Sequence, residues 1–319
     1  MSSGPIETSV SATDVQLAGD ILRVVHGGLP DLETSNAQTA LEALRRTHQA
    51  FRRFLNQPPH GNAMVNSCLL YPPALPETDG TLFLASRFAY APLAGTALMA
   101  AAAILARQAL ENGQDARDAY FFQTASGRAR INVQNAAGLT AQAEWITAPP
   151  AMLSANAELP GASGSTHSVS LVSTGLPYLV ADEETLGASL DDHASLGPAA
   201  AALSRRASEV FPTSRFGADA SYARYLVMAI RQTARDHIRT VWISDAGEIA
   251  SSAGGTGALA VVAACQARGL VQLGTRITIE APGGAFDCRI SSSQASVRAE
   301  TRITASHLFY WPGESGTVK

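Results

Sequence analysis

The stretch SSAGGTGALAVVAACQARG, residues 251–269, combines residue types and spacing that could bind a ligand. Its glycines would let a ligand approach the backbone, and the helix expected after them would present unpaired N–H groups to an anion. A nucleotide loop is excluded, because the stretch lacks both the lysine of a P-loop and the fingerprint of a dinucleotide site. Two interpretations stay open: a tight turn that starts a buried helix, or a site for a carboxylate or carbonyl oxygen.

Composition removes several classes of function. The chain has 319 residues, 46% of them apolar, and a net charge of −4, so a globular fold is expected and a nucleic-acid partner is not. Its only lysine is Lys319, which excludes pyridoxal chemistry on an internal lysine. The three cysteines form no Cys-x-x-Cys pair, and Asp236, His237 and Asp245 match no metal-ligand spacing, so neither a metal nor another cofactor is expected. With no secretory pattern and no bilayer-spanning apolar run, the chain is predicted to be cytoplasmic, without membrane contact.

Two alanine-rich segments are predicted to be buried helices. Residues 95–113 and 255–274 each follow a loop of small residues with Gly and Thr, and each ends near a glycine. Strands are expected around both, with a further amphipathic helix over 34–59 and another helix over 221–236. The Pro-, Ala-, Gly- and Ser-rich residues 149–167 indicate a linker. This pattern favours a duplicated α/β architecture, although similar composition alone would also explain the repeat.

Four segments, in the same order, resemble motifs of the proline racemase family, which includes hydroxyproline epimerases and a hydroxyproline dehydratase. Residues 14–30 are similar to Asp-x-His-Thr-x-Gly-Glu-Pro-x-Arg-Val-Val, and residues 54–73 to a Glu-Pro-Arg-Gly-His-x-x-Met segment with Met64 in register. Residues 89–100 take the place of Gly-Tyr-x-x-Met-Cys-Gly-His-Gly-Thr-Ile-Ala. Residues 250–260 take the place of Asp-Arg-Ser-Pro-Cys-Gly-Thr-Gly-Thr-Ser-Ala.

The resemblance implies a diaminopimelate-epimerase-like α/β (α+β) fold. Two pseudo-symmetric halves would each form a curled, mostly antiparallel sheet around a central helix, with the ligand in a cleft between them. The N-terminal half would comprise residues 1–150 and 296–319, and the C-terminal half residues 151–295. In the family, both helix starts hold the substrate carboxylate, which implies as substrate-binding residues Ala94, Gly95, Thr96, Gly254, Gly255 and Thr256.

The chain departs from the family at the residues that move the proton. The family's two cysteines, one per half, correspond to Ala94 and Gly254, and neither residue can transfer a proton. Thr96 replaces a histidine, Ala250 an aspartate, and Gln16 the histidine of the opening motif. Amino-acid racemisation and epimerisation are therefore not expected.

Four residues are candidates for replacement catalytic groups: His60, Thr96, Ser252 and Asp182. His60 lies one position from the family's Arg-Gly-His segment, and a surface-loop histidine is the other interpretation. Ser252 flanks the glycine loop and could instead cap the helix. Asp182 ends a stretch similar to Gly-Gly-Asn-Phe-Tyr-x-x-Val-Asp, where a structural turn is equally compatible.

Three functions are compatible with this pattern. The first is a repurposed, non-racemising enzyme: an isomerase, lyase or cyclase for a fairly apolar small molecule with a carbonyl or carboxyl group, in specialised-metabolite biosynthesis. The second is a catalytically inactive homologue that binds a ligand or partner. The third is a hydroxyproline-type dehydratase, which the missing base and aspartate disfavour. A small-molecule substrate is the expected partner, and a homodimer is one option.

Overall fold

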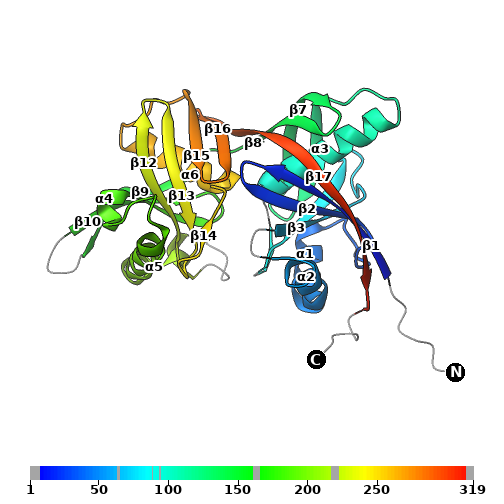
Figure 1. Ribbon diagram of the computed structural model, residues 1–319, viewed down its shortest axis with the longest axis horizontal. Helices are drawn as coiled ribbons and strands as arrows, with labels where there is room; N and C mark the ends of the chain where they lie inside the picture. The colour runs from blue at the N-terminus through cyan, green and yellow to red at the C-terminus, as the bar shows by residue number, and fades with distance from the viewer. Residues whose placement is uncertain are drawn as a thin grey trace. The chain divides into compact units, whose positions relative to one another are not determined.

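The computed structural model describes residues 8–62, 65–87, 89–92, 95–160, 166–216 and 223–313 (Figure 1). It divides into two compact units. Unit 1 comprises Met1–Trp145 and Glu300–Lys319, and unit 2 comprises Ile146–Ala299. Both limits fall inside strands, namely β8 (Thr140–Thr147) and β17 (Ala295–Trp311).

In unit 1, strands pack around the helix α3 (Gly95–Glu111). Every residue from Gly95 to Ile104 is buried, and the alanines of this segment let strands approach the helix closely from several sides. Two strand pairs are parallel, β2 (Asp20–Gly27) with β3 (Val65–Tyr71) and β4 (Gly80–Ala85) with β6 (Ala119–Thr124). The other elements of the unit are β1 (Thr8–Leu17), β2 (Asp20–Gly27), α1 (Ala37–Thr47), α2 (Gln49–Asn56), β3 (Val65–Tyr71), β4 (Gly80–Ala85), β5 (Tyr90–Ala91), β6 (Ala119–Thr124) and β7 (Gly127–Ala137).

In unit 2, strands pack in the same way around α6 (Gly255–Ala267), which is buried on almost every side. Again two pairs are parallel, β11 with β12 and β13 with β15. The other elements are β9 (Ala151–Pro160), β10 (Thr166–Ser173), β11 (Pro177–Asp182), α4 (Glu183–Leu186), α5 (His193–Val210), a 3-10 helix (Thr213–Phe216), β12 (Leu226–Ala234), β13 (His237–Ile243), β14 (Ile249–Ala250), β15 (Arg276–Ala281) and β16 (Gly284–Ile290).

The two units repeat one order of elements. Two strands, two helices, three strands, the central helix and two more strands run from β1 to β7 in unit 1 and from β10 to β16 in unit 2. The parallel pairs occupy equivalent places in this order. The predicted α/β fold, with similar halves built around central helices, is confirmed.

Three local predictions were wrong. Residues 221–236, predicted as a helix, contain the strand β12, because the buried apolar run Leu226–Ile230 pairs with β11 on one side and β13 on the other. The helix predicted over 34–59 is two helices, α1 and α2, which meet at His48. The predicted linker 149–167 contains strand β9, which pairs with β10.

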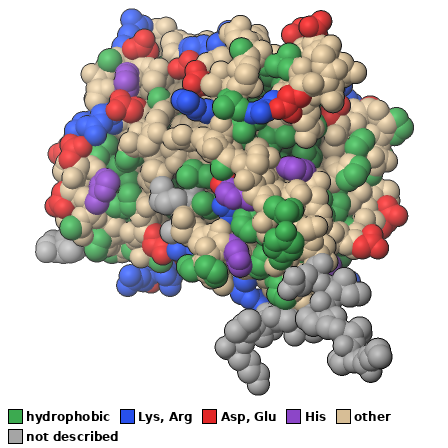
Figure 2. Space-filling model, turned by 45° about the vertical axis from the view of Figure 1, so that its right-hand side comes forward, with side chains coloured by type: hydrophobic (Ala, Val, Ile, Leu, Met, Phe, Trp, Pro, Cys, Tyr) green, Lys and Arg blue, Asp and Glu red, His purple; other side chains and the backbone are tan. Residues whose placement is uncertain are grey.

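The described part of the chain contains no helix that is long and apolar enough to cross a membrane. On the face drawn in Figure 2, side chains of both charges are interspersed. This mixture differs from the concentrated basic face of nucleic-acid-binding proteins.

Candidate functional site

The glycine loop of unit 2 ends at the start of α6. Gly254 precedes the helix with φ 62° and ψ 151°, a conformation that is essentially restricted to glycine. It offers no side chain to cap the helix, so the N–H groups of the first turn point toward its position without a capping oxygen. A Cβ built on Gly254 would meet no heavy atom within 4 Å. The position that a side chain of residue 254 would take is therefore open.

Two hydroxyl groups border this helix start. The Ser252 hydroxyl, which is buried, accepts a hydrogen bond from the Gly254 N–H at 3.1 Å. The Thr256 Oγ1 lies 2.9 Å from the hydroxyl oxygen of Tyr178, a buried residue of β11. Tyr178 was not predicted from the sequence, since no spacing rule connects residues 178 and 256. The start of α6 therefore presents backbone N–H donors and the Thr256 hydroxyl, which the Tyr178 hydroxyl orients.

The corresponding helix start in unit 1 is covered by an indole ring. A Cβ on Gly95 would lie 2.1 Å from Cε3 of Trp145, so the ring packs directly on the glycine. Thr96 in the same turn is 7% exposed. Ala94, predicted to bind substrate, lies outside the described residues. Trp145 was also missed by the sequence reasoning, because only the folded chain brings the end of β8 to this turn.

The residues retained from the opening motif form a buried ion pair. Asp14 on β1 accepts from Nε and Nη2 of Arg23 on β2 at 2.9 and 3.1 Å, and His307 Nε2 lies 2.8 Å from its Oδ2. Arg23 also donates to the backbone carbonyl of His60 at 2.5 Å. The His60 ring packs on Phe54 of α2, with ring centroids 4.4 Å apart. His60 thus belongs to an aromatic cluster beside this ion pair.

Asp182 lies apart from the glycine loop. Its Oδ2 accepts from Nη2 of Arg268 at 2.5 Å, and Arg268 is the residue that follows α6. The helix between Gly254 and Arg268 is about 20 Å long, at about 1.5 Å per residue. Of the two candidate catalytic residues in unit 2, Ser252 and Asp182, only Ser252 lies at the start of α6.

Neither loop itself carries a thiol or an imidazole in place of the missing cysteines. Residues 92–99 and 250–257 contain no acidic, basic, histidine or cysteine side chain. Burial raises the pKa of Cys265 to about 12, and burial also raises the pKa values of Cys68 and Cys288. A thiol with such a pKa is not a useful base near neutral pH. Among the described residues, no three His, Cys, Asp or Glu side chains gather as a metal site would require.

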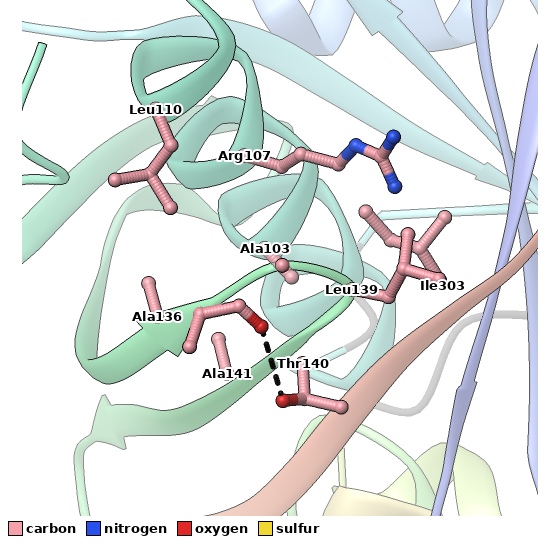
Figure 3. Close-up of a pocket in the computed structure, with 10 residues that line it drawn as sticks. Ala103, Arg107, Leu110, Ala136, Leu139, Thr140, Ala141 and Ile303 are labelled. Atoms are coloured by element: carbon pink, nitrogen blue, oxygen red, sulfur yellow. Dashed lines mark hydrogen bonds between the residues drawn. The ribbon is translucent and has the colours of Figure 1, made fainter. Parts of the chain in front are cut away.

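Two hollows lie at the other end of α3, away from its first turn. Figure 3 shows one of them, a pocket of about 10 Å³, under the β7–β8 turn between Leu110, Leu139 and Ile303. That volume is about enough for one water molecule. The other is a polar surface groove of about 290 Å³, lined by residues that include Asn112, Arg117 and Tyr120. Neither contains a residue of the two helix starts.

Comparisons with known proteins extend over nearly the whole chain. A family model described as proline racemase matches residues 12–306. A protein of Chromohalobacter salexigens is 24% identical over 201 residues, which cover 62% of this chain and only 55% of that relative. The chain thus matches about half the length of this curated relative.

Solved structures of low sequence identity share the fold. A hydroxyproline epimerase from Agrobacterium vitis, with bound trans-4-hydroxy-L-proline, superposes with a TM-score of 0.78 at 18% identity, covering 97% of this chain and 94% of that one. A probable proline racemase from Agrobacterium radiobacter K84, with bound carbonate, gives 0.75 at 19% identity, covering 94% and 91%. Because the family model matches residues 12–306, nearly the whole chain, this chain belongs to the proline racemase family.

Proposed function

We propose that this chain is an enzyme that binds a small carboxylate or carbonyl compound at the start of α6 and does not racemise amino acids. The observation that carries the proposal is the conformation of Gly254. The position assigned by resemblance to a catalytic cysteine holds a glycine whose backbone disfavours any side chain; the place of its Cβ is open, and it makes no side-chain cap for α6.

Binding would rest on backbone hydrogen bonds. The N–H groups of Gly255, Thr256 and Gly257 would donate to a ligand oxygen, helped by the positive end of the helix dipole. The Thr256 hydroxyl, held by Tyr178, would add a further donor. Because residues 250–257 contain no charged side chain, an ammonium group on the ligand would find no counter-ion in this loop. A fairly apolar ligand without an amine is therefore favoured over proline.

Chemistry at this site would depend on polarisation. Donors placed where negative charge develops stabilise an enolate or oxyanion, which suits an isomerase, lyase or cyclase. A two-base racemisation needs an ionisable group on each face of the reacting carbon, and neither loop contains one. Such a change of chemistry on an inherited fold would suit the biosynthesis of a specialised metabolite in the cytoplasm.

The first test is turnover of the family's substrates. The chain is incubated with L-proline and with trans-4-hydroxy-L-proline, with a hydroxyproline epimerase as positive control. We expect chiral chromatography to show no change of configuration and mass spectrometry to show no loss of water. Racemisation or epimerisation would refute the proposal, and loss of water would support the dehydratase instead.

The second test is binding at the start of α6. Benzoate and phenylacetate, apolar carboxylates without an amine, should raise the melting temperature, since a ligand that binds only the folded state stabilises it. Thr256→Val should weaken this binding about threefold to tenfold, the usual effect of losing one hydrogen bond. Thr233→Val, at an exposed position of β12, is the matched control and should have no effect.

A catalytically inactive binding protein is the second candidate. The observation that favours it is the lack of any acid or base side chain in both loops. Binding of carboxylates without turnover of any carbonyl compound that binds would support this candidate over the enzyme.

A further inference from the structure

The outer face of the hairpin formed by β6 and β7 carries two arginines beside one phenylalanine. The two strands pair antiparallel, with Phe121 opposite Arg130. Arg128 and Arg130 are exposed, whereas Ala129 and Ile131, which alternate with them along β7, are buried. Residues two apart on one strand lie about 7 Å from each other. The alternation of β7 therefore places two positive charges close together on one face.

One aromatic ring holds both guanidinium groups. The Cζ atom of Arg128 lies 4.4 Å from the centroid of the Phe121 ring, and that of Arg130 lies 5.9 Å from the same centroid. Both separations are within the range of a cation–π contact, about 6 Å. Arg128 also donates through Nη2 to the carbonyl of Glu77 at 3.0 Å. Arg130 donates through Nε to Oδ1 of Asn132 at 2.9 Å, so both groups are oriented before any ligand arrives.

Among the described residues, no carboxylate forms an ion pair with either of these arginines. The Asp79 carboxylate accepts from the N–H of Phe121 at 2.8 Å, but it pairs with Arg117 instead. A guanidinium group has five N–H donors, and within the described chain Arg128 and Arg130 each commit one of them to a hydrogen bond. Two like charges with uncommitted donors thus share one surface.

We propose that Arg128 and Arg130 form a binding site for a phosphate group, carried by inorganic phosphate or by a small phosphate monoester. Guanidinium groups bind phosphate oxygens through paired hydrogen bonds. A phosphate monoester carries nearly two negative charges at pH 7 and offers three acceptor oxygens, so it can neutralise both arginines. A carboxylate brings one charge and two oxygens, which satisfies the pair less completely. The site lies in unit 1, whereas the ligand proposed above binds in unit 2.

The test is isothermal titration calorimetry of the full chain with inorganic phosphate at pH 7.5 and constant ionic strength. We expect saturable binding with a Kd on the order of 1 mM, because two exposed side chains supply the contacts. Arg128→Gln and Arg130→Gln should each raise the Kd about fivefold to tenfold, the effect of losing a hydrogen bond to a charged group. Arg289→Gln is the matched control and should leave the Kd unchanged. Arg289 is likewise exposed on a strand, β16, and donates to one backbone carbonyl, that of Gly274.

The charge of the ligand gives a readout that does not depend on how the variants fold. Phosphate loses its second negative charge below a pKa of about 6, so the Kd should rise severalfold between pH 7.5 and pH 5.5. Sulfate is doubly charged at both pH values and should bind with one Kd, which controls for titration of the protein. Phenyl phosphate separates the two sources of the phosphate group. A Kd at least about threefold below that of inorganic phosphate indicates a monoester site, and an equal or higher Kd indicates inorganic phosphate.

A second measurement uses only the unmodified chain. Phenylglyoxal modifies accessible arginines, and about 20 mM phosphate, well above the expected Kd, should protect Arg128 and Arg130 but not Arg289, as read by peptide mass spectrometry. The absence of saturable binding, an unchanged Kd in both variants, an equal loss in the Arg289→Gln control, or a phosphate Kd that does not respond to pH would each overturn the proposal. Stabilisation by benzoate should be the same in Arg128→Gln and Arg130→Gln as in the unmodified chain, so either proposal can fail alone.

Discussion

Gly254, the residue before α6, and Gly95, the first residue of α3, each require glycine for a different reason. At Gly254 the constraint is the backbone, with φ at 62° and free space where a Cβ would lie. At Gly95 the constraint is a neighbour, because the Trp145 ring fills that space. The two sites should therefore respond differently to the same substitution.

Gly254→Ala and Gly254→Cys should lower the free energy of unfolding by nearly equal amounts, about 1–3 kcal/mol. The cost comes from the conformation, which any Cβ makes unfavourable, and not from side-chain volume. Urea unfolding of the unmodified chain and of the two variants measures this loss of unfolding free energy. A cysteine variant much less stable than the alanine variant would contradict this explanation, and we expect neither variant to racemise proline.

Gly95→Ala should destabilise the chain by about 1–3 kcal/mol through overpacking against the indole. Replacement of the ring by a smaller side chain, Trp145→Leu, leaves space beside residue 95. The added cost of Gly95→Ala should then fall in the Trp145→Leu background. Thermal unfolding of four proteins, the unmodified chain, the two single variants and the double variant, measures this difference. An equal loss of stability from Gly95→Ala in both backgrounds would show that the ring does not cause the strain.

At the scale of elements, the Asp14–Arg23 ion pair joins β1 to β2 directly across their hairpin, where the two residues are register partners. Both side chains are less than a tenth exposed. The pair also reaches β17 through His307 and the end of α2 through the carbonyl of Leu55. It therefore fixes four elements of unit 1 around one buried carboxylate.

Arg23→Met should cost about 3–5 kcal/mol of stability, because it leaves the Asp14 carboxylate buried without its main partner. The double variant Asp14→Leu with Arg23→Met should regain most of that loss, since two apolar side chains can replace a buried pair at little cost. Denaturant unfolding of the single and double variants measures the coupling. Additive losses would show that the two residues act independently.

Elements with a strong local pattern could be predicted from the sequence. The alanine runs of α3 and α6 begin at Gly95 and Gly255, the residues where the pattern predicted them to begin. β12 was mistaken for a helix because a short, continuously apolar run fits either structure. The contacts of Tyr178 and Trp145 could not be predicted, because they join residues that only the folded sheet brings together. The catalytic and substrate-binding roles that the sequence assigned to residues such as Ser252 and Thr256 remain predictions.

At the scale of the molecule, one strand serves both units. β17 pairs with β16 through residues up to Arg298, in unit 2, and with β1 through its later residues, in unit 1. The core of unit 1 includes Phe309 and Trp311 at its margin. Unit 1 is therefore built from both ends of the chain, whereas unit 2 is one continuous segment.

A chain that ends at Ala299 should lose the cooperative unfolding of unit 1 and keep that of unit 2. The truncation removes β17, one of the two partner strands of β1, and leaves 146–299 whole. Hydrogen exchange followed by mass spectrometry should show fast exchange in residues 8–27 and retained protection in α6 and β11–β13. Uniform loss of protection in both units would contradict this division.

The shared strand also has a consequence for synthesis on the ribosome. Residues up to 145 leave the ribosome before unit 2 exists, but β1 lacks its second partner strand until residues 302–311 have been translated. At about 5–20 residues per second, that wait lasts roughly ten to thirty seconds. Unit 2 is complete earlier, so the unit whose translation starts first is the last to mature. During that interval, chaperones would meet an N-terminal half that still exposes the edge of β1.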